Sequence, residues 1–271
     1  MTNSIFPLGG FNSLVRGRDA FYLANENDAY VGQSLIKYGE YCETEFRVLS
    51  RLVSPGNYIA EIGANVGAHT VRLAKLIGLD GRVTAFEPQP VLFQALAGTI
   101  ALNSLMNVDC FPFALGKNKE QIMFPSIDYR RPNNFGGLSL LDLKGGGTKI
   151  YIEKFDTVYL HETLDFLKID VEGMELEVLK GAKSSIQRHQ PILYVENDNQ
   201  EKSSSLIKWI FDAGYRLWWH LPSLFNPDNF FGNQDNIFKN LVSINMIGIP
   251  RNLAIDMPFP EIVKTDDFPL N

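Results

Sequence analysis

The chain has 271 residues, of which 45% are hydrophobic and 21% are charged, and its formal net charge at pH 7 is −6. These values are typical of a globular domain and exclude a disordered chain, a collagen and a coiled coil. An acidic chain is also a poor candidate for non-specific binding to nucleic acid, which depends on clustered Lys and Arg. The length corresponds to one or two domains.

The sequence carries few signs of membrane insertion or export. No apolar run approaches the roughly 18 residues of a spanning helix, and no cation precedes Arg16, so a signal peptide is not expected. The two cysteines, Cys42 and Cys110, are too few for a disulfide framework. We therefore expect no membrane span and a reducing, cytoplasmic location.

Hydrophobic periodicity predicts an alternation of strands and helices. A helix is expected at 40–53, before the alternation begins. The predicted strands are 58–62, 83–86, 108–113, 164–169, 191–196, 215–219 and 242–249. The predicted helices between them are 66–77, 91–103, 174–186 and 203–213. This alternation indicates βαβ units around a buried, mostly parallel sheet.

The same pattern divides the chain into three parts. Residues 1–57 are predicted to form a strand and helix extension that packs on the core. Residues 58–250 form the main α/β domain, and residues 251–271 form a tail. A glycine-rich loop or hairpin insertion near 114–162 interrupts the domain. Because inserted loops often carry specificity, we expect this one to cover the substrate.

The most informative segment runs from Glu61 to Gly67, after a strand and before a helix. Gly63 permits a sharp turn close to a ligand, and Gly67 permits close packing of the following helix. The next strand ends in Glu87, whose carboxylate can accept both hydroxyls of a ribose. The loop and Glu87 together indicate a cofactor that contains a ribose.

The glycine spacing favours one such cofactor over another. A dinucleotide fold needs a further glycine where Asn65 stands. Glu61 would repel a pyrophosphate, whereas it suits the ammonium group of S-adenosylmethionine (AdoMet). A nucleotide-dependent oxidoreductase and a non-catalytic binding module stay open as alternatives.

Three blocks of sequence, at 58–67, 85–88 and 167–173, resemble the hallmark blocks of the FkbM family of AdoMet-dependent methyltransferases. The resemblance implies a class I Rossmann-like fold, with a mostly parallel seven-stranded sheet and helices on both faces. It also implies methyl transfer, typically to a hydroxyl of a sugar, a polyketide or a similar metabolite. The cofactor contacts that it implies are Glu61, Gly63, Ala64, Asn65, Gly67, Glu87, Pro88, Phe113, Ala114 and Asp170.

A second cluster of acidic residues follows the strands at 164–169 and 191–196. We expect Asp170, Glu172, Glu196 and Asp198 to converge on the crevice that contains Glu61. Like charges raise one another's pKa, and such a carboxylate can act as the general base for an alcohol. Asp170 is the preferred candidate, since Glu172 is equally explained as an acid that stabilises a helix N-terminus.

Three further predictions concern the chemistry of the acceptor. His69 is a candidate base or a packed histidine, and it stands where many relatives carry an aromatic residue. A divalent cation on the acidic cluster is possible but not favoured. Trp218 and Trp219 should point to opposite faces of a strand, mainly as core residues. The amine-methylating signature N-P-P-Y is absent, so the sequence predicts O-methylation of a small molecule.

Overall fold

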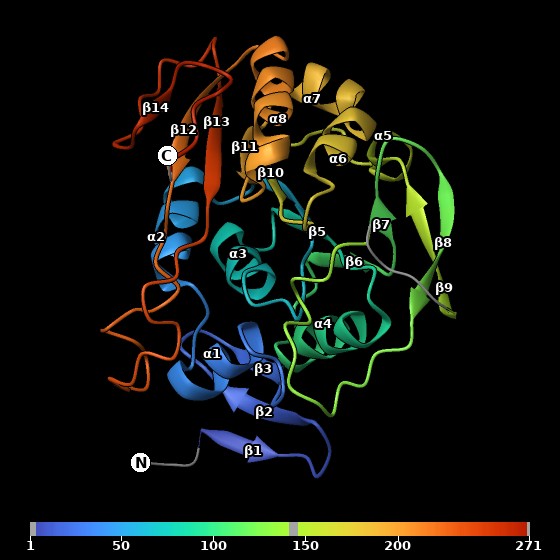
Figure 1. The fold of residues 1–271 in the computed structure, drawn as a ribbon, viewed down its shortest axis with the longest axis vertical. Coiled ribbons are helices and arrows are strands. Elements are labelled where there is room, and N and C mark those ends of the chain that lie inside the picture. The colour runs from blue at the N-terminus through green and yellow to red at the C-terminus, as the bar shows by residue number, and fades with distance from the viewer. Residues whose placement is uncertain (1–3, 141–145, 270–271) are drawn as a thin grey trace.

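Eight strands form one mixed sheet in the computed structural model, which describes residues 4–140 and 146–269 (Figure 1). From one edge to the other they are β14 (Glu261–Ile262), β12 (Tyr215–His220), β13 (Asn245–Pro250), β11 (Ile192–Glu196), β10 (Phe166–Ile169), β4 (Tyr58–Ile62), β5 (Arg82–Phe86) and β6 (Val108–Phe111). The run from β11 to β6 is parallel, whereas β13 is antiparallel to both of its neighbours. The predicted α/β class is confirmed, with one strand more than expected because β14 pairs with β12.

Helices cover both faces of this sheet, as predicted (Figure 1). One face packs against α5 (Phe155–Val158), α6 (Glu175–Gly181), α7 (Lys183–His189) and α8 (Gln200–Asp212). The other packs against α2 (Glu43–Leu52), α3 (Thr70–Ile77) and α4 (Pro90–Leu102). Ala60 and Ile62 belong to the first core and Ile59 to the second. By this alternation Glu61 faces α2 and α3.

Two predicted helices differ from the observed ones. The helix expected from residue 66 begins at Thr70, because Asn65 (φ 52) and Gly67 (φ 84) lie in the left-handed region. The helix expected at 174–186 is divided at Ala182 into α6 and α7. At that point the backbone of Gly181 closely approaches the carbonyl oxygen of Gly116. This contact depends on distant residues, and periodicity cannot reveal it.

The N-terminal segment forms its own small layer beside the main sheet (Figure 1). An antiparallel sheet of β1 (Ile5–Pro7), β2 (Asn12–Arg16) and β3 (Phe21–Asn25) is followed by α1 (Val31–Tyr38). Leu35 of α1 packs in one apolar cluster with Val71 of α3 and Leu92 of α4. The segment therefore lies against the helices that flank the glycine loop.

The insertion near 114–162 contains a second three-stranded sheet of β7 (Ala114–Leu115), β9 (Gly147–Glu153) and β8 (Glu120–Pro125). Residues 129–137, called the strap below, run between this sheet and the N-terminal segment. The Asn25 amide donates to the carbonyl of Tyr129 at 3.1 Å, and the Ala29 N–H donates to that of Asn133 at 2.9 Å. In the described ranges, no helix has the length and apolar character needed to cross a membrane.

Candidate active site

The glycine loop is shaped by a close approach of two backbones. Gly63 has φ 87, and a Cβ atom on it would lie 1.8 Å from the carbonyl oxygen of Asp170. Only glycine fits this position, and it brings the ends of β4 and β10 together. Gly67 instead lies against Leu96 of α4, where a Cβ would meet the leucine Cδ1 at 2.8 Å. Gly67 was expected to let the following helix pack against the strand, whereas the close contact that it allows is with α4.

Glu87 follows β5 and is 4% exposed. Its Oε2 accepts a hydrogen bond from the Asn65 N–H at 2.9 Å, and its Oε1 accepts one from the Gln89 N–H at 2.9 Å. Each carboxylate oxygen keeps a second lone pair for a ligand. Burial raises the pKa of Glu87 to about 7, although the two N–H donors oppose the shift.

Two adjoining cavities open at this edge of the sheet. The larger, of about 260 Å³, is lined by polar groups of the glycine loop and the acidic cluster and by Tyr41 and Ile244. The smaller, of about 40 Å³, is mainly apolar and includes Phe113 and Leu140. Both cavities are lined by Gly63, Glu87, Gly136, Asp170 and Glu172. The two cavities therefore adjoin along these residues, and together they form one candidate site.

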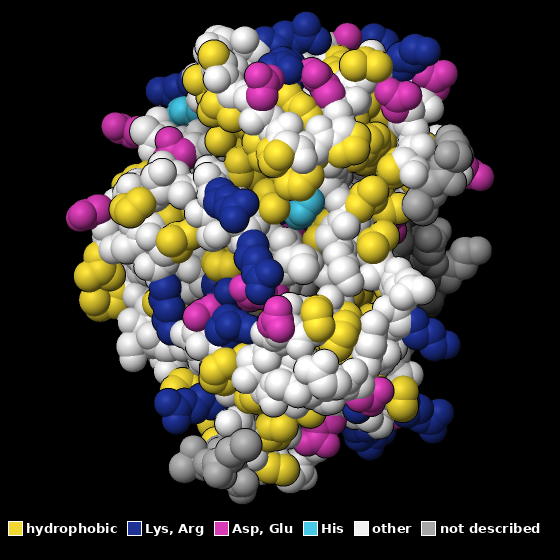
Figure 2. Space-filling view, turned by 90° about the vertical axis from the view of Figure 1, so that its left-hand side faces the viewer, with side chains coloured by type: hydrophobic (Ala, Val, Ile, Leu, Met, Phe, Trp, Pro, Cys, Tyr) yellow, Lys and Arg dark blue, Asp and Glu magenta, His cyan; other side chains and the backbone are white. Residues whose placement is uncertain are grey.

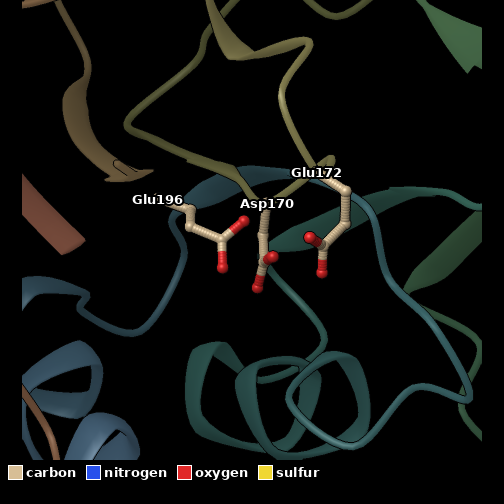
Figure 3. Close-up of side chains that lie close together, drawn as sticks. All are labelled: Asp170, Glu172 and Glu196. Atoms are coloured by element: carbon tan, nitrogen blue, oxygen red, sulfur yellow. The ribbon is translucent and has the colours of Figure 1, made fainter. Parts of the chain in front are cut away.

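The predicted acidic cluster is present in the larger cavity. Carboxylate oxygens of Asp170, Glu172 and Glu196 lie within 4.8 Å of one another, and Figure 3 shows the three groups turned toward one another. Asp198 also lines the cavity. Burial and the neighbouring acids raise the pKa of Glu172 to about 8 and that of Glu196 well above its usual range. Glu172 was expected at the start of a helix. It lies before the helix instead, since it has φ 54 and α6 begins at Glu175.

Lys168 is a central residue of the site that the sequence analysis missed. It is 2% exposed, and its Nζ lies 2.7 Å from Asp170 Oδ2 and 3.8 Å from Glu45 Oε1. It is also the register partner of Glu61 across β10 and β4. Burial alone would lower the Lys168 pKa, but the attraction of Asp170, Glu45 and Glu61 outweighs it and raises the pKa. A lysine inside an otherwise apolar strand was the available signal, because such a charge needs buried partners.

Glu61 is almost completely buried beneath the glycine loop. It is 2% exposed, and its Oε2 accepts a hydrogen bond from Thr70 Oγ1 at 2.5 Å. Burial raises the pKa of Glu61 to about 7, while Lys168 and Thr70 oppose the shift. Its carboxylate therefore lies in the floor of the larger cavity, at the entrance of the loop as predicted.

His69 lies in the turn before α3 and lines the larger cavity. It is 5% exposed, and within the described ranges neither ring nitrogen has a hydrogen-bond partner. Its Nε2 is 3.7 Å from Glu45 Oε1, a carboxylate from the N-terminal segment. Burial, with the cations Lys168 and Arg72, holds the pKa of His69 well below its usual range, so the ring is neutral.

Most of the predicted site residues come together in these cavities. The exception among the cofactor candidates is Gly67, which is not among the described residues that line either cavity. All four catalytic candidates, Asp170, Glu172, Glu196 and His69, line the larger one. Trp219 and Trp218 belong to the two different cores on opposite faces of the sheet, as predicted. Tyr41 and Glu45, which the sequence analysis did not single out, complete the wall.

The insertion lines both parts of the site. Gly136 contributes to both cavities, and Gly137 to the larger one. Leu138 and Leu140 line the smaller apolar cavity beside Phe113. The expectation that the insertion covers the substrate stays a prediction, and residues 141–145 of it lie outside the described residues.

The acidic cluster has the oxygen ligands and the spacing that a hard divalent cation requires. One of its members is already neutralised, because the Lys168 ammonium group is 2.7 Å from Asp170. A second cation beside this ammonium group would be repelled. We therefore assign no metal to the cluster.

Comparison with known proteins agrees with this geometry. The pattern of the Methyltransferase FkbM domain matches residues 61–217, which is more than half of the chain. A curated relative, methyltransferase sdnD of Sordaria araneosa, is 28% identical over 159 residues, which are 47% of this chain and 61% of the relative. The crystal structure of methyltransferase FkbM from Methylobacillus flagellatus KT superposes with a TM-score of 0.50 and 18% identity, covering 72% of this chain and 44% of that one.

The chain thus spans less than two thirds of both proteins. The structural likeness shows a shared fold, and the match over residues 61–217 contains the glycine loop, Glu87 and the acidic cluster. This match favours a methyltransferase over the oxidoreductase that the sequence left open. The chain belongs to the FkbM methyltransferase family.

Proposed function

We propose that the protein transfers a methyl group from AdoMet to a hydroxyl of a small molecule. The observation that carries the proposal is that an apolar and a polar cavity adjoin at Gly63, Glu87 and Asp170, which line both. An apolar cavity beside a polar one suits AdoMet, which has an apolar adenine at one end and a charged methionine at the other.

In this proposal the adenine occupies the smaller cavity, against Pro88, Phe113 and Ala114. The ribose hydroxyls donate to Glu87, and the glycine loop from Gly63 to Asn65 follows the rest of the cofactor. The ammonium group lies toward Glu61 and Asp170. The support is the lining of the two cavities and the free lone pairs of Glu87.

The larger cavity is then shared between the methionine end and the acceptor. Several of its lining residues lie outside the segment matched by the family, namely Tyr30, Val31, Tyr41, Glu45, Leu224, Leu241, Val242, Ser243 and Ile244. This wall combines aromatic and aliphatic side chains with the carboxyl group of Glu45 and the hydroxyl of Ser243. It supports an uncharged acceptor that carries both hydroxyls and an apolar portion, since the hydroxyls can form hydrogen bonds with the polar groups and the apolar portion can pack against the other side chains.

A small acceptor is also favoured over RNA. On the face seen in Figure 2, the described Lys and Arg side chains alternate with Asp and Glu and do not form a continuous basic surface. The chain as a whole has a net charge of −6. Binding to a phosphate backbone depends on the opposite charge pattern.

The cofactor assignment is tested by calorimetry with AdoMet on Glu87→Ala, with Glu120→Ala as the control on an exposed strand residue. Two charge-assisted hydrogen bonds are removed, each worth about 1.5–3 kcal/mol, so affinity should fall by about 10²-fold or more. An unchanged affinity in Glu87→Ala would contradict the assignment.

The acceptor assignment is tested with AdoMet carrying a ¹³C-labelled methyl group and a panel of methyl glycosides, catechols, hydroxylated macrolactones and primary amines. The expected product carries an O-¹³CH₃ group, recognised by its carbon chemical shift. Products that carry the label only on nitrogen would overturn O-methylation while leaving the cofactor assignment intact.

A further inference from the structure

His69 is a polar side chain buried at a cavity wall without a partner. It is 5% exposed, and among the described residues no donor or acceptor lies within hydrogen-bond range of either ring nitrogen. Leaving buried polar atoms unpaired costs free energy, so such atoms are rare and call for an explanation. Because His69 lines the larger cavity, the explanation closest at hand is a polar group of the bound acceptor.

The surroundings of His69 hold the ring in one place. The edge of the Tyr41 ring meets it with centroids 5.7 Å apart, and the Phe46 ring lies 6.1 Å away. Phe46 in turn carries the Arg72 guanidinium over its face at 3.6 Å. A ring enclosed in this way is positioned before a ligand arrives, which is the condition for efficient proton transfer.

Glu45 is the charged neighbour of this ring. Its Oε1 lies 3.7 Å from His69 Nε2 and 3.8 Å from Lys168 Nζ, and in the described part of the chain it too has no hydrogen-bond partner. Burial raises the pKa of Glu45 to about 7, against the attraction of Lys168. Glu45 can therefore stabilise a proton that reaches the ring.

We propose that His69 is the general base that takes the proton of the acceptor hydroxyl, and that Glu45 is the residue that positions and stabilises it. This inference rests on the proposed O-methyltransferase function. The acceptor oxygen forms a bond to the methyl carbon, whose bond to sulfur breaks with both electrons left on sulfur. The hydroxyl proton passes to a ring nitrogen of His69 and is later released to water.

The charge balance favours this step. The positive charge of the sulfonium disappears as the imidazolium forms, so the total charge in the cavity stays constant. While the sulfonium is present, it joins Lys168 and Arg72 in keeping the ring neutral. Once the methyl group has left, that repulsion is gone and the ring becomes a stronger base. Proton transfer is thereby coupled to methyl transfer.

The carboxylates are poorer candidates for this role. Asp170 Oδ2 is held by the Lys168 ammonium group at 2.7 Å. Glu172 and Glu196 lie close enough to repel each other, and their raised pKa values favour the protonated form at neutral pH. A protonated carboxyl cannot accept the proton of an alcohol. Its remaining use is to hold the acceptor through hydrogen bonds.

The decisive experiment measures kcat, KM and AdoMet affinity for His69→Asn and Glu45→Gln with the alcohol that the panel identifies. His69→Asn should lower kcat by about 10²-fold or more, with AdoMet affinity within about twofold of the wild type, and Glu45→Gln should lower kcat by about tenfold. His161→Asn is the matched control, because His161 packs against Tyr58 and Tyr159 and is not among the described cavity residues. A kcat in His69→Asn within about threefold of the wild type would overturn the proposal.

Chemical rescue separates a base from a packing residue. In His69→Gly, added imidazoles should restore turnover, and the restored rate should rise with the basicity of the azole. A purely structural cavity would be filled equally well by azoles of similar size and different pKa. Rescue that is independent of basicity would therefore also count against the proposal.

A measurement without an acceptor distinguishes this inference from the proposed function. In protein labelled with ¹⁵N-histidine, His69 should be a neutral imidazole between about pH 6 and pH 8, in a single tautomer that Glu45→Gln disturbs. Its resonance is identified by its loss in His69→Asn. A charged ring at pH 7 overturns the His69 inference even if O-methylation is found. If no alcohol is methylated although the ring is neutral and coupled to Glu45, the proposed function has failed, and the assignment of His69 as the base for a hydroxyl falls with it.

Discussion

At Gly63 the backbone has φ 87 and lies against the carbonyl of Asp170. Replacing this glycine by any other residue would therefore cost free energy twice, through backbone strain and through steric overlap. Gly63→Ala should lose about 1–3 kcal/mol to the left-handed backbone alone, and more to the overlap with the carbonyl. Gly56→Ala is a matched control, because Gly56 has φ 84 and no described atom lies within 4 Å of the position that a Cβ would occupy. Chemical denaturation should show a clearly larger loss for Gly63→Ala, together with loss of AdoMet binding. Equal losses would mean that the close approach of β4 and β10 is not required.

Lys168 is the residue whose removal should disturb the site most. Lys168→Met leaves Asp170, Glu45 and Glu61 without their buried cation, and breaking such a pair costs about 3–5 kcal/mol. Lys208→Met, which breaks an exposed pair with Asp212, should cost less than about 1 kcal/mol. Urea unfolding of the two variants gives the comparison. A Lys168→Met protein as stable as the wild type would show that the carboxylates are already neutral when it is present.

Residues of the site differ in how far the sequence could predict them. Glu61, Glu87 and Asp170 belong to short motifs at strand ends, where local spacing and topology determine which groups meet. Glu45 and Tyr41 join the site from a helix and a loop that no motif connects with the sheet. The pairing of Glu45 with His69 and Lys168 depends on how α2 packs across β10, and periodicity indicates only that α2 has an apolar face.

The elements of the sheet were predictable for a related reason. Each central strand is a short apolar run followed by a helix, so β4, β5, β10 and β11 were expected within two residues of their observed bounds. The errors lie where a long-range contact decides the backbone, as at Gly67 and Gly181. The two-residue strand β14 carries no periodic signal, and it exists because β12 offers it a free edge.

The strap and α1 are coupled elements. The Asp28 Oδ2 accepts the Gly32 N–H at 2.7 Å at the start of α1, and its Oδ1 accepts the Phe135 N–H at 3.4 Å. Phe135 in turn accepts from the Gln89 amide at 2.7 Å, two residues after Glu87. These bonds connect the N-terminal segment to the loop that follows β5.

Asp28→Ala should therefore loosen α1 and the strap together. Loss of the bond from the Gly32 N–H costs about 1.5–3 kcal/mol, so the amides of Gly32 and Phe135 should exchange with solvent about tenfold to 10²-fold faster. Hydrogen exchange followed by mass spectrometry measures both segments at once. Asp212→Ala removes an exposed carboxylate that pairs with Lys208, and it serves as the control. Faster exchange in α1 with an unchanged strap would show that the two elements are independent.

For the molecule as a whole, the buried acids make stability depend on pH. Burial raises the pKa values of Glu45, Glu61 and Glu87 to about 7, above the value of about 4.5 that they have in the unfolded chain. Between these values the folded state binds more protons than the unfolded state. The stabilisation of the folded state by protons on these three carboxyl groups is complete below about pH 4.5 and is lost as the pH rises through 7. Stability should therefore fall between about pH 5 and pH 8.

AdoMet should oppose this fall, because its net positive charge favours the ionised carboxylates around it. Between pH 5 and pH 8 the free protein is expected to lose on the order of 2–3 kcal/mol of unfolding free energy for each of these three groups, since each pKa unit of one group corresponds to about 1.4 kcal/mol. A saturating concentration of AdoMet should raise the melting temperature more at pH 8 than at pH 5.5, and binding should release protons into the buffer. Thermal melts at both pH values and calorimetry in buffers of different ionisation enthalpy test the two statements. The same stabilisation at both pH values, without proton release, would mean that the buried acids do not respond to the cofactor, and the electrostatic basis for assigning AdoMet to this cavity would fail.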